Sequence, residues 1–313
     1  MATAEPTIDH AGPARIGLAL GSGAARGWAH IGVLRALARA GIKPDIIAGT
    51  SMGALVGGVE LCGHLDTLSE WSMSLNRKRI FGYLDLGIAS GGLLGGKPLV
   101  ELMTEHIGDQ RIEDLPVRFV AVVTDLVTGH EVWLRRGPIV ESIHAAIALP
   151  GLFAPVNLGG RWYVDGALVN PVPVSVCRAY GAQLVIAVNL NADPVGRTRI
   201  MGTPISRAIG FDPLDELGKN HVSLLGTVWH HVLRREPNTP SIFGVMANSF
   251  NILQDRITRS RLAGDPPDVT IGPKVGHVGL LEFDRAAEVI AEGERAAERA
   301  LPEIHEAMAI LGL

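Results

Sequence analysis

A serine flanked by glycines is the first group in the sequence whose surroundings suggest chemistry. Residues 49–53 read Gly-Thr-Ser-Met-Gly, so Ser51 occupies the centre of a G-x-S-x-G motif. Between a strand and a helix this pentapeptide forms a sharp turn that exposes the serine hydroxyl as a nucleophile. Gly49 and Gly53 leave room for the close-packed turn, and the first amides of the next helix point toward the hydroxyl. The alternative is an ordinary strand-to-helix turn whose serine only caps the helix.

A second glycine-rich turn lies upstream, at residues 21–27, with the sequence GSGAARG. The backbone N–H groups of such a loop can bind a phosphate, or the oxyanion that forms when a hydroxyl attacks an ester carbonyl. As an oxyanion site the loop would use its first residues, which are Gly21, Ser22, Gly23 and Ala24. Dinucleotide binding is disfavoured, because the sixth position of G-x-G-x-x-G should be glycine and is Arg26 here.

Asp165 is the third candidate, and it stands at the end of an expected strand at residues 162–164, directly before Gly166. Asp-Gly is a frequent closure of a β-hairpin. Taken alone, Asp165 is therefore most simply a turn residue.

The elements around these motifs alternate between strands and helices. Apolar runs predict strands at residues 15–20 and 44–48, and helical spacing predicts helices at 28–40 and 54–62. Further strands are expected at 117–124, 131–134, 162–164, 184–189 and 269–271, and a further helix at 138–149. This order predicts an α/β fold with a largely parallel central sheet covered by helices on both faces.

The rest of the chain suggests one domain. Residues 1–14 are expected to be a flexible lead-in, and 15–313 a single domain that includes a C-terminal helical tail. The tail begins at Ala286 and carries an apolar stripe interrupted by Pro302, so we expect a bent helix packed on the body. Residues 80–96 lack a clear period and are expected to form a loop or flap.

Composition sets further limits. The chain has 47% hydrophobic and 19% charged residues and a net charge of -4, which gives no basis for nucleic-acid binding. Its two cysteines, Cys62 and Cys177, favour a reducing compartment, and no ligand spacing suggests a metal or another cofactor. The first 13 residues lack a secretion signal, and no apolar run approaches the roughly 20 residues of a membrane span. We therefore expect a cytoplasmic protein that meets a membrane, if at all, from its surface.

Together the three motifs resemble the patatin-like phospholipase family, particularly its bacterial members related to the catalytic domain of neuropathy target esterase. The family's oxyanion loop with its Arg-Gly pair matches residues 21–27, where Arg26 and Gly27 form the pair. Its G-x-S-x-G matches 49–53, and its Asp-Gly-Gly or Asp-Gly-Ala matches 165–167.

The resemblance covers residues 15–190 well and 248–281 more loosely. Two stretches near the aspartate, residues 149–153 and 170–173, are also similar to the family. Ser22 is a departure, since the family often has a third consecutive glycine there.

The resemblance implies a three-layer architecture and a serine acyl hydrolase acting on lipid or other carboxylic esters. Ser51 would be the nucleophile and Asp165 the base that takes its proton and later activates water. Because a carboxylate of ordinary pKa is a poor base, we predict that Asp165 is desolvated and its pKa raised. The amides of Gly23, Ala24 and Ser22 would hold the oxyanion.

Two alternatives stay open: a Ser, Asp and His triad that uses His277, and a regulatory protein that keeps the fold but is catalytically weak. Basic residues beside apolar ones at 77–81 and 229–235 could rest on an anionic lipid surface, or could be ordinary solvated helix ends. The choice between a phospholipid, a lysophospholipid, a neutral glyceride and a simple ester stays open, as does the oligomeric state.

Overall fold

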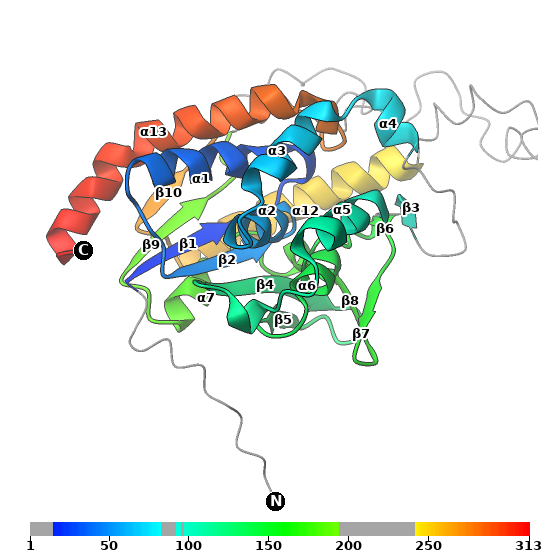
Figure 1. Ribbon diagram of the computed structural model, residues 1–313, viewed down its shortest axis with the longest axis horizontal. Helices are drawn as coiled ribbons and strands as arrows, with labels where there is room; N and C mark the ends of the chain where they lie inside the picture. The colour runs from blue at the N-terminus through cyan, green and yellow to red at the C-terminus, as the bar shows by residue number, and fades with distance from the viewer. Residues whose placement is uncertain (1–14, 83–91, 95–96, 194–241) are drawn as a thin grey trace, which may run out of the picture.

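The computed structural model describes residues 15–82, 92–94, 97–193 and 242–313. An eight-stranded mixed sheet forms their centre, in the order β10-β9-β1-β2-β4-β8-β7, with β5 paired to β4 (Figure 1). The strands are β1 Ile16–Leu20, β2 Ile46–Thr50, β4 Arg118–Asp125, β5 Glu131–Leu134, β7 Val156–Leu158, β8 Arg161–Asp165, β9 Leu184–Val188 and β10 Val269–Ile271. From β10 to β4 the strands are parallel, whereas β5, β7 and β8 pair antiparallel.

The parallel strands are apolar along their whole length because both of their faces are covered. Every residue of β1, β2 and β9 is buried. In β1, Leu18 and Leu20 belong to the larger hydrophobic core, while Ala19 between them belongs to a second core on the other face. The sheet is therefore the middle layer of three.

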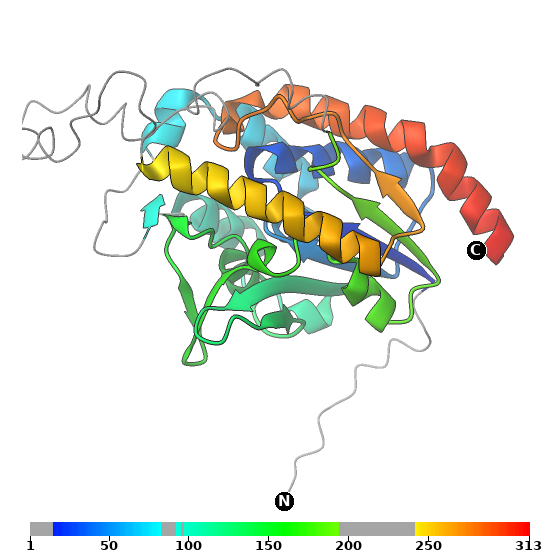
Figure 2. The same ribbon diagram turned by 180° about the vertical axis from the view of Figure 1, so that it is seen from behind.

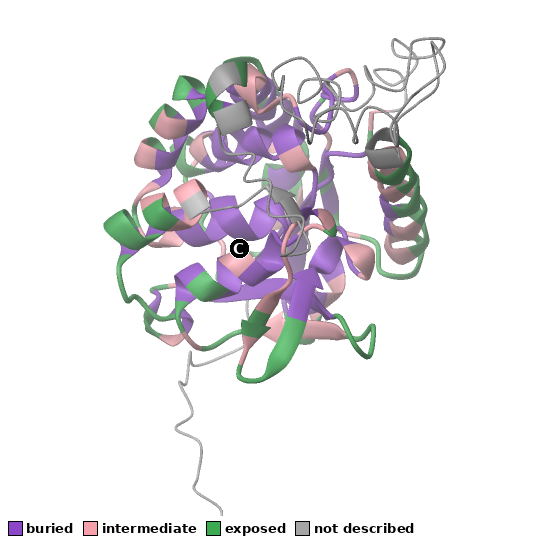
Figure 3. Ribbon diagram, turned by 90° about the vertical axis from the view of Figure 1, so that its right-hand side faces the viewer, coloured by how far each residue is buried: buried purple, intermediate pink, exposed green. Residues whose placement is uncertain are grey.

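Helices form the two outer layers, as Figures 1 and 2 show from opposite sides. The longer helices are α1 Ala29–Arg39, α2 Met52–Leu61, α3 Leu65–Ser74, α4 Arg77–Gly82, α5 Lys97–Ile107, α6 Ile139–Ala146, α7 Val174–Ala179, α12 Ile242–Gly264 and α13 Ala286–Leu311. Short 3-10 helices are η1 Ala24–Trp28, η3 Ile112–Asp114, η4 Gly166–Leu168 and η5 Phe283–Arg285. The first core includes residues of α1, α2, α6 and α13, and the second includes residues of α7. Figure 3 shows the buried strands between these helical layers.

The C-terminal helix α13 lies along α1 at very short range (Figure 1). A Cβ on Gly32 of α1 would lie 2.0 Å from the carbonyl oxygen of Ile290, and one on Gly293 would lie 2.0 Å from that of Ala29. Glycine on both helices is therefore what allows the contact. Pro302 does not end α13, which continues to Leu311.

The predicted fold is confirmed: an α/β sandwich whose sheet is mixed, with helices on both sides. The strands expected at 131–134 and 269–271 have the observed bounds, and the other expected strands differ by one or two residues at an end. Three short strands were not predicted: β7, and the pair β3 Gly92–Leu94 and β6 Gly151–Phe153, which forms a small parallel sheet. The stretch 80–96 expected as a loop contains the end of α4 and β3, and its remainder lies outside the described residues. Within the described ranges, no helix is long and apolar enough to cross a membrane.

Candidate active site

Ser51 stands on a sharp turn between β2 and α2. Its backbone has φ 56° and ψ -125°, a conformation that a residue with a side chain rarely adopts and that costs free energy. The packing around the turn holds it there. A Cβ on Gly53 would lie 2.1 Å from the carbonyl oxygen of Leu20, and one on Gly49 would lie 2.5 Å from the backbone of Ala54. The two glycines of the motif thus let α2 start directly against the end of β1.

Asp165 ends β8 and is fixed through its own backbone. Its N–H donates to the carbonyl of Ala148 at 3.0 Å, and its carbonyl accepts the Thr124 hydroxyl at 2.9 Å. The next residue must be glycine, because a Cβ on Gly166 would lie 2.3 Å from the carbonyl oxygen of Val122. The Asp-Gly pair therefore ends a sheet strand and is not a simple hairpin turn.

The two side chains meet. Ser51 Oγ donates to Asp165 Oδ2 at 2.5 Å, and the Ala167 N–H donates to Asp165 Oδ1 at 2.8 Å. Asp165 is completely buried, and Ser51 retains 7% of its accessible surface. Burial raises the pKa of Asp165 to about 7, against the opposing effect of the hydrogen bonds from Ser51 and Ala167. The expected desolvation of this carboxyl is confirmed.

The glycine-rich loop follows β1 and lies beside the serine turn, since the carboxyl ends of parallel strands meet at one edge of the sheet. Two of its N–H groups are already used. Gly21 donates to the Val188 carbonyl at 3.1 Å, and Ser22 donates to the Pro171 carbonyl at 2.8 Å. The expectation that all four residues from Gly21 to Ala24 offer donors is therefore wrong for the first two, which anchor the loop to its neighbours.

The amides of Gly23 and Ala24 remain. Among the described residues neither N–H has a hydrogen-bond partner. Ala24 has a φ of 48° and lines the same cavity as Ser51. A Cβ on Gly23 would lie 2.5 Å from Cδ1 of Leu190, so a larger residue there would have to displace that side chain. The loop thus presents two unpaired donors, and one of them, Ala24, has a strained backbone.

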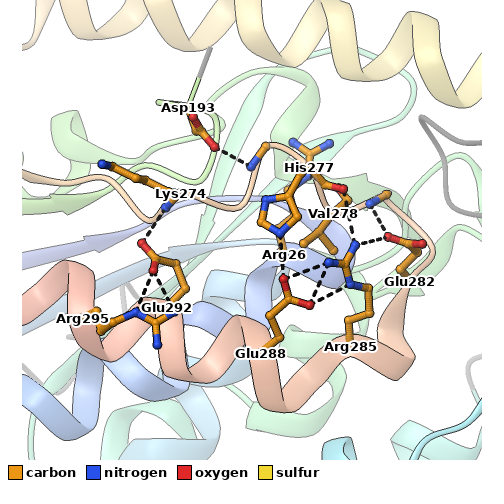
Figure 4. A network of polar contacts seen from close by, with 12 residues as sticks. Arg26, Asp193, Lys274, His277, Val278, Glu282, Arg285, Glu288, Glu292 and Arg295 are labelled. Carbon is orange, nitrogen blue, oxygen red and sulfur yellow. Dashed lines mark hydrogen bonds and ion pairs between the residues drawn. The ribbon is translucent and has the colours of Figure 1, made fainter. Parts of the chain in front are cut away.

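Residues 25–27, the second half of the loop, are bonded to or packed against neighbouring segments. Arg26 is buried, and its Nε donates to the Val278 carbonyl at 3.0 Å (Figure 4). The Ala25 N–H donates to the Leu280 carbonyl at 3.1 Å. A Cβ on Gly27 would lie 2.2 Å from that of Met52, the residue after the serine. The Arg-Gly pair therefore joins the loop both to the 275–281 turn and to the start of α2.

His277 belongs to a different group of side chains. Its Nε2 lies 2.7 Å from Glu288 Oε1, and Glu288 also pairs with Arg285 (Figure 4). The Ser51 hydroxyl bonds Asp165 instead. His30 lies fully buried, with Nε2 2.7 Å from the carbonyl oxygen of Gly21.

An apolar cavity adjoins the serine. It has an empty volume of about 780 Å³ including its open mouth. Its described lining consists of Ala24, Trp28, Ser51, Met52, Trp71, Leu75, Ile80, Pro98, Leu99, Ile147, Leu149, Leu152, Phe153 and Phe283. Ser51 is the one polar residue among them. Trp28 packs edge-on against Trp71 and Phe283, with ring centroids 6.2 and 6.1 Å apart.

Apart from residues in the two glycine-rich turns and in the stretch 149–153, the lining comes from segments without a motif, so the sequence did not indicate the cavity. In the described part of the chain no cluster of three or more His, Cys, Asp or Glu side chains could hold a metal ion. Of the two basic segments, residues 229–235 lie outside the described residues. In the other, Arg77 and Arg79 are exposed while the neighbouring Ile80 lines the cavity.

Comparison with known proteins supplies the class. The model of the patatin-like phospholipase family matches residues 18–178. An uncharacterized NTE family protein of Mycobacterium tuberculosis (strain ATCC 25618 / H37Rv) is 35% identical over 328 residues, covering 92% of this chain and 91% of that protein. The chain therefore belongs to the patatin-like phospholipase family. Within that family it is related to the NTE proteins.

Two further matches are more distant. The lysophospholipase NTE1 of Pyricularia oryzae is 26% identical over 292 residues, which cover 89% of this chain and 18% of that much longer protein. The crystal structure of VipD from Legionella pneumophila aligns with a TM-score of 0.46 and 15% identity over 93% of this chain and 67% of that chain, a likeness too weak to bear on function. Family membership supports hydrolase activity on lipid esters in general.

Proposed function

We propose that this protein hydrolyses carboxylic esters of lipids through a Ser51 and Asp165 dyad and an acyl-enzyme intermediate. The observation that carries the proposal is the 2.5 Å hydrogen bond from Ser51 Oγ to a buried carboxylate. A serine hydroxyl becomes a competent nucleophile when a base accepts its proton. Asp165 is already in contact with that proton, and its pKa of about 7 makes its carboxylate a far stronger base than an exposed aspartate.

The first half of the reaction follows from the positions of these groups. Ser51 Oγ attacks the ester carbonyl while its proton moves to Asp165, and the carbonyl oxygen becomes an oxyanion. The N–H groups of Gly23 and Ala24 are the donors for that charge, and removing one such donor in other hydrolases costs roughly 3 kcal/mol. Collapse of the tetrahedral intermediate releases the alcohol, which takes the proton from Asp165.

The second half repeats the proton transfer with water. Asp165 accepts a proton from a water molecule that attacks the acyl-enzyme, and Ser51 recovers its proton as the acid leaves. One carboxyl thus serves as base and acid in turn. This double role suits a group whose pKa lies near neutrality.

The cavity supports an acyl chain as the part of the substrate that is bound inside the protein. Its described lining is apolar apart from the reacting serine, so hydrocarbon is the chemistry that it fits. Phospholipids, lysophospholipids and neutral glycerides all contain an acyl chain of this kind. Because one distant relative is named a lysophospholipase, lysophosphatidylcholine belongs in the first set of substrates tested.

Contact with a lipid surface is part of the same proposal. Helix α4 carries exposed Arg77 and Arg79 beside Ile80 of the cavity wall. Basic side chains next to an apolar entrance favour an anionic lipid surface. Substituting Arg79→Glu should weaken sedimentation with phosphatidylglycerol vesicles and leave hydrolysis of a water-soluble ester unchanged; unaltered sedimentation would remove α4 from the proposal.

The decisive experiment combines covalent labelling with three variants. A fluorophosphonate should label the wild-type protein at Ser51 and leave Ser51→Ala unlabelled. Asp165→Asn should lose ester hydrolysis while remaining folded, and His277→Ala should keep it. Turnover retained by Asp165→Asn and lost by His277→Ala would instead assign a triad, and an unlabelled wild type would assign a non-catalytic protein.

A further inference from the structure

The side chain of His30 is a buried titratable group beside the oxyanion loop that the proposed chemistry does not use. It is the second residue of α1 and has no accessible surface. Its Nε2 lies 2.7 Å from the carbonyl oxygen of Gly21. A carbonyl can only accept, so Nε2 must carry the hydrogen. Nδ1 is buried without a partner in the described part of the chain.

Burial keeps this imidazole neutral. It lowers the pKa of His30 to about 4, although the hydrogen bond to Gly21 acts in the opposite direction. At neutral pH the ring is therefore a single tautomer, and its one N–H donates to the Gly21 carbonyl. Such a group can hold a backbone carbonyl in place without bringing a charge close to the oxyanion.

Gly21 is held on both sides of its backbone. Its N–H donates to Val188 of β9, and its carbonyl accepts from His30 of α1. The next N–H, from Ser22, donates to Pro171. Three separate segments thus fix the two residues that directly precede the unpaired amides of Gly23 and Ala24.

The same carbonyl also lies against the nucleophile turn. A Cβ on Gly53 would lie 2.9 Å from the Gly21 oxygen, so the first turn of α2 packs directly on it. The hydrogen bond from His30 therefore holds a peptide group that touches both the oxyanion loop and the helix starting beside Ser51.

We propose that His30 is a positioning residue for catalysis: by donating to the Gly21 carbonyl, it sets where the Gly23 and Ala24 amides stand relative to Ser51. The inference rests on the proposed hydrolase function. Stabilisation of a transition-state charge depends on donors that are already in place, so a small displacement of the loop lowers the rate of the chemical step more than the binding of substrate.

The test compares three variants on a water-soluble ester, p-nitrophenyl butyrate. His30→Phe keeps a planar ring and removes the donor, whereas His30→Gln returns a donor at a similar distance from the backbone. Val33→Ala is the control, because Val33 is equally buried in α1 and makes no contact with the loop through a polar group.

We expect His30→Phe to lower kcat/KM roughly 10- to 100-fold, mainly through kcat. His30→Gln should recover much of the loss, and Val33→Ala should lower the melting temperature with kcat nearly unchanged.

A second readout separates positioning from simple loss of stability. A trifluoromethyl ketone becomes an oxyanion when it adds to serine, so its inhibition constant should weaken by the same factor as kcat/KM across the His30 variants. If folded His30→Phe retains both values, the inference is overturned. It is also overturned if His30→Gln is no better than His30→Phe, or if Val33→Ala loses activity to the same extent. A wild-type protein that neither hydrolyses the ester nor binds the ketone would overturn the proposed function itself.

Discussion

Asp165 accepts the hydroxyl hydrogen of Ser51 at 2.5 Å although the two residues are 114 positions apart in the sequence. The carboxylate has only one other hydrogen bond on the described chain, from the Ala167 N–H, and no cation pairs with it there. An isolated buried carboxylate is costly, and the fold holds it beside the serine turn, where we propose that it acts as the base. This cost in free energy, together with the strained backbones of Ser51 and Ala24, leads to the following predictions.

The rate of ester hydrolysis should depend on the ionisation of Asp165. Below pH 7 the carboxyl is increasingly protonated and cannot accept the Ser51 proton, so kcat/KM should rise with pH up to about 7 and level off above it. A pH profile with p-nitrophenyl butyrate checks this expectation. A flat profile between about pH 5 and pH 8 would contradict the role of Asp165 as the base.

Replacing the same carboxyl should stabilise the fold at alkaline pH. The folded pKa of about 7 lies above the ordinary aspartate value of 3.8, so the folded state binds a proton more tightly than the unfolded chain, and stability is lost as pH rises from about 4 to about 7. The full difference corresponds to roughly 4 kcal/mol. Asparagine in place of Asp165 regains only part of this free energy of unfolding, because its buried amide group needs a new hydrogen-bond acceptor.

Asp165→Asn should therefore melt at a higher temperature than the wild type at pH 8, and the two should converge near pH 4. Thermal unfolding at both pH values measures this. Equal melting temperatures at pH 8 would mean that the carboxyl is better solvated than its burial indicates.

The strained backbone of Ala24 should distinguish glycine from a branched residue. At φ 48° glycine has no penalty, whereas a β-branched side chain is strongly disfavoured. Ala24→Gly should keep activity within a few-fold, and Ala24→Val should lower kcat roughly 100-fold by displacing the loop amides. Steady-state kinetics of the two variants, with circular dichroism to confirm folding, checks the pair; equal activity would show that the Ala24 amide does not contact the oxyanion.

The serine turn should not tolerate a side chain at Gly53. A Cβ there meets the Leu20 carbonyl oxygen at 2.1 Å, and backbone cannot move away as a side chain can. Gly53→Ala should destabilise the protein by roughly 1 to 3 kcal/mol and abolish fluorophosphonate labelling. Gly264→Ala is the matched control, since a Cβ on Gly264 has nothing within 4 Å and should be neutral in chemical denaturation. Wild-type labelling of Gly53→Ala would mean that the turn can relax.

Narrowing the cavity should change the preferred chain length. Leu99 lies in its wall, so Leu99→Trp removes space that a long acyl chain needs. We expect kcat/KM to fall at least roughly 10-fold for p-nitrophenyl palmitate and to change little for the butyrate. A parallel loss with both esters would place the acyl chain elsewhere.

Much of the fold follows from local patterns. Glycine-rich turns after short apolar runs, followed by helical spacing, define the opening strands and helices, because backbone sterics and hydrophobic periodicity act over a few residues. The bounds of β5 and β10 were predicted for that reason. Of the four three-residue strands in the described chain, β10 was predicted, whereas β3, β6 and β7 were missed because strands this short depend mainly on the partners they meet.

In the candidate site, too, local patterns predicted some features and tertiary contacts decided the others. The motifs indicated Ser51 and Asp165, and the resemblance implied that they act together. The assignment of donors to Gly21 and Ser22 was wrong because the acceptors that occupy their amides, Val188 and Pro171, come from distant parts of the chain. His30 had no distinguishing signal in the sequence beyond its place near the start of a predicted helix.

By itself, the sequence determined the alternation of strands and helices, the two turns that require glycine, and the residue types of the proposed nucleophile and base. Tertiary structure alone decided which loop amides stay unpaired, how far Asp165 is removed from water, and which apolar side chains line the cavity. The physical reason is that turn geometry depends on neighbours along the chain, whereas desolvation and hydrogen-bond partners depend on whatever the folded chain brings close.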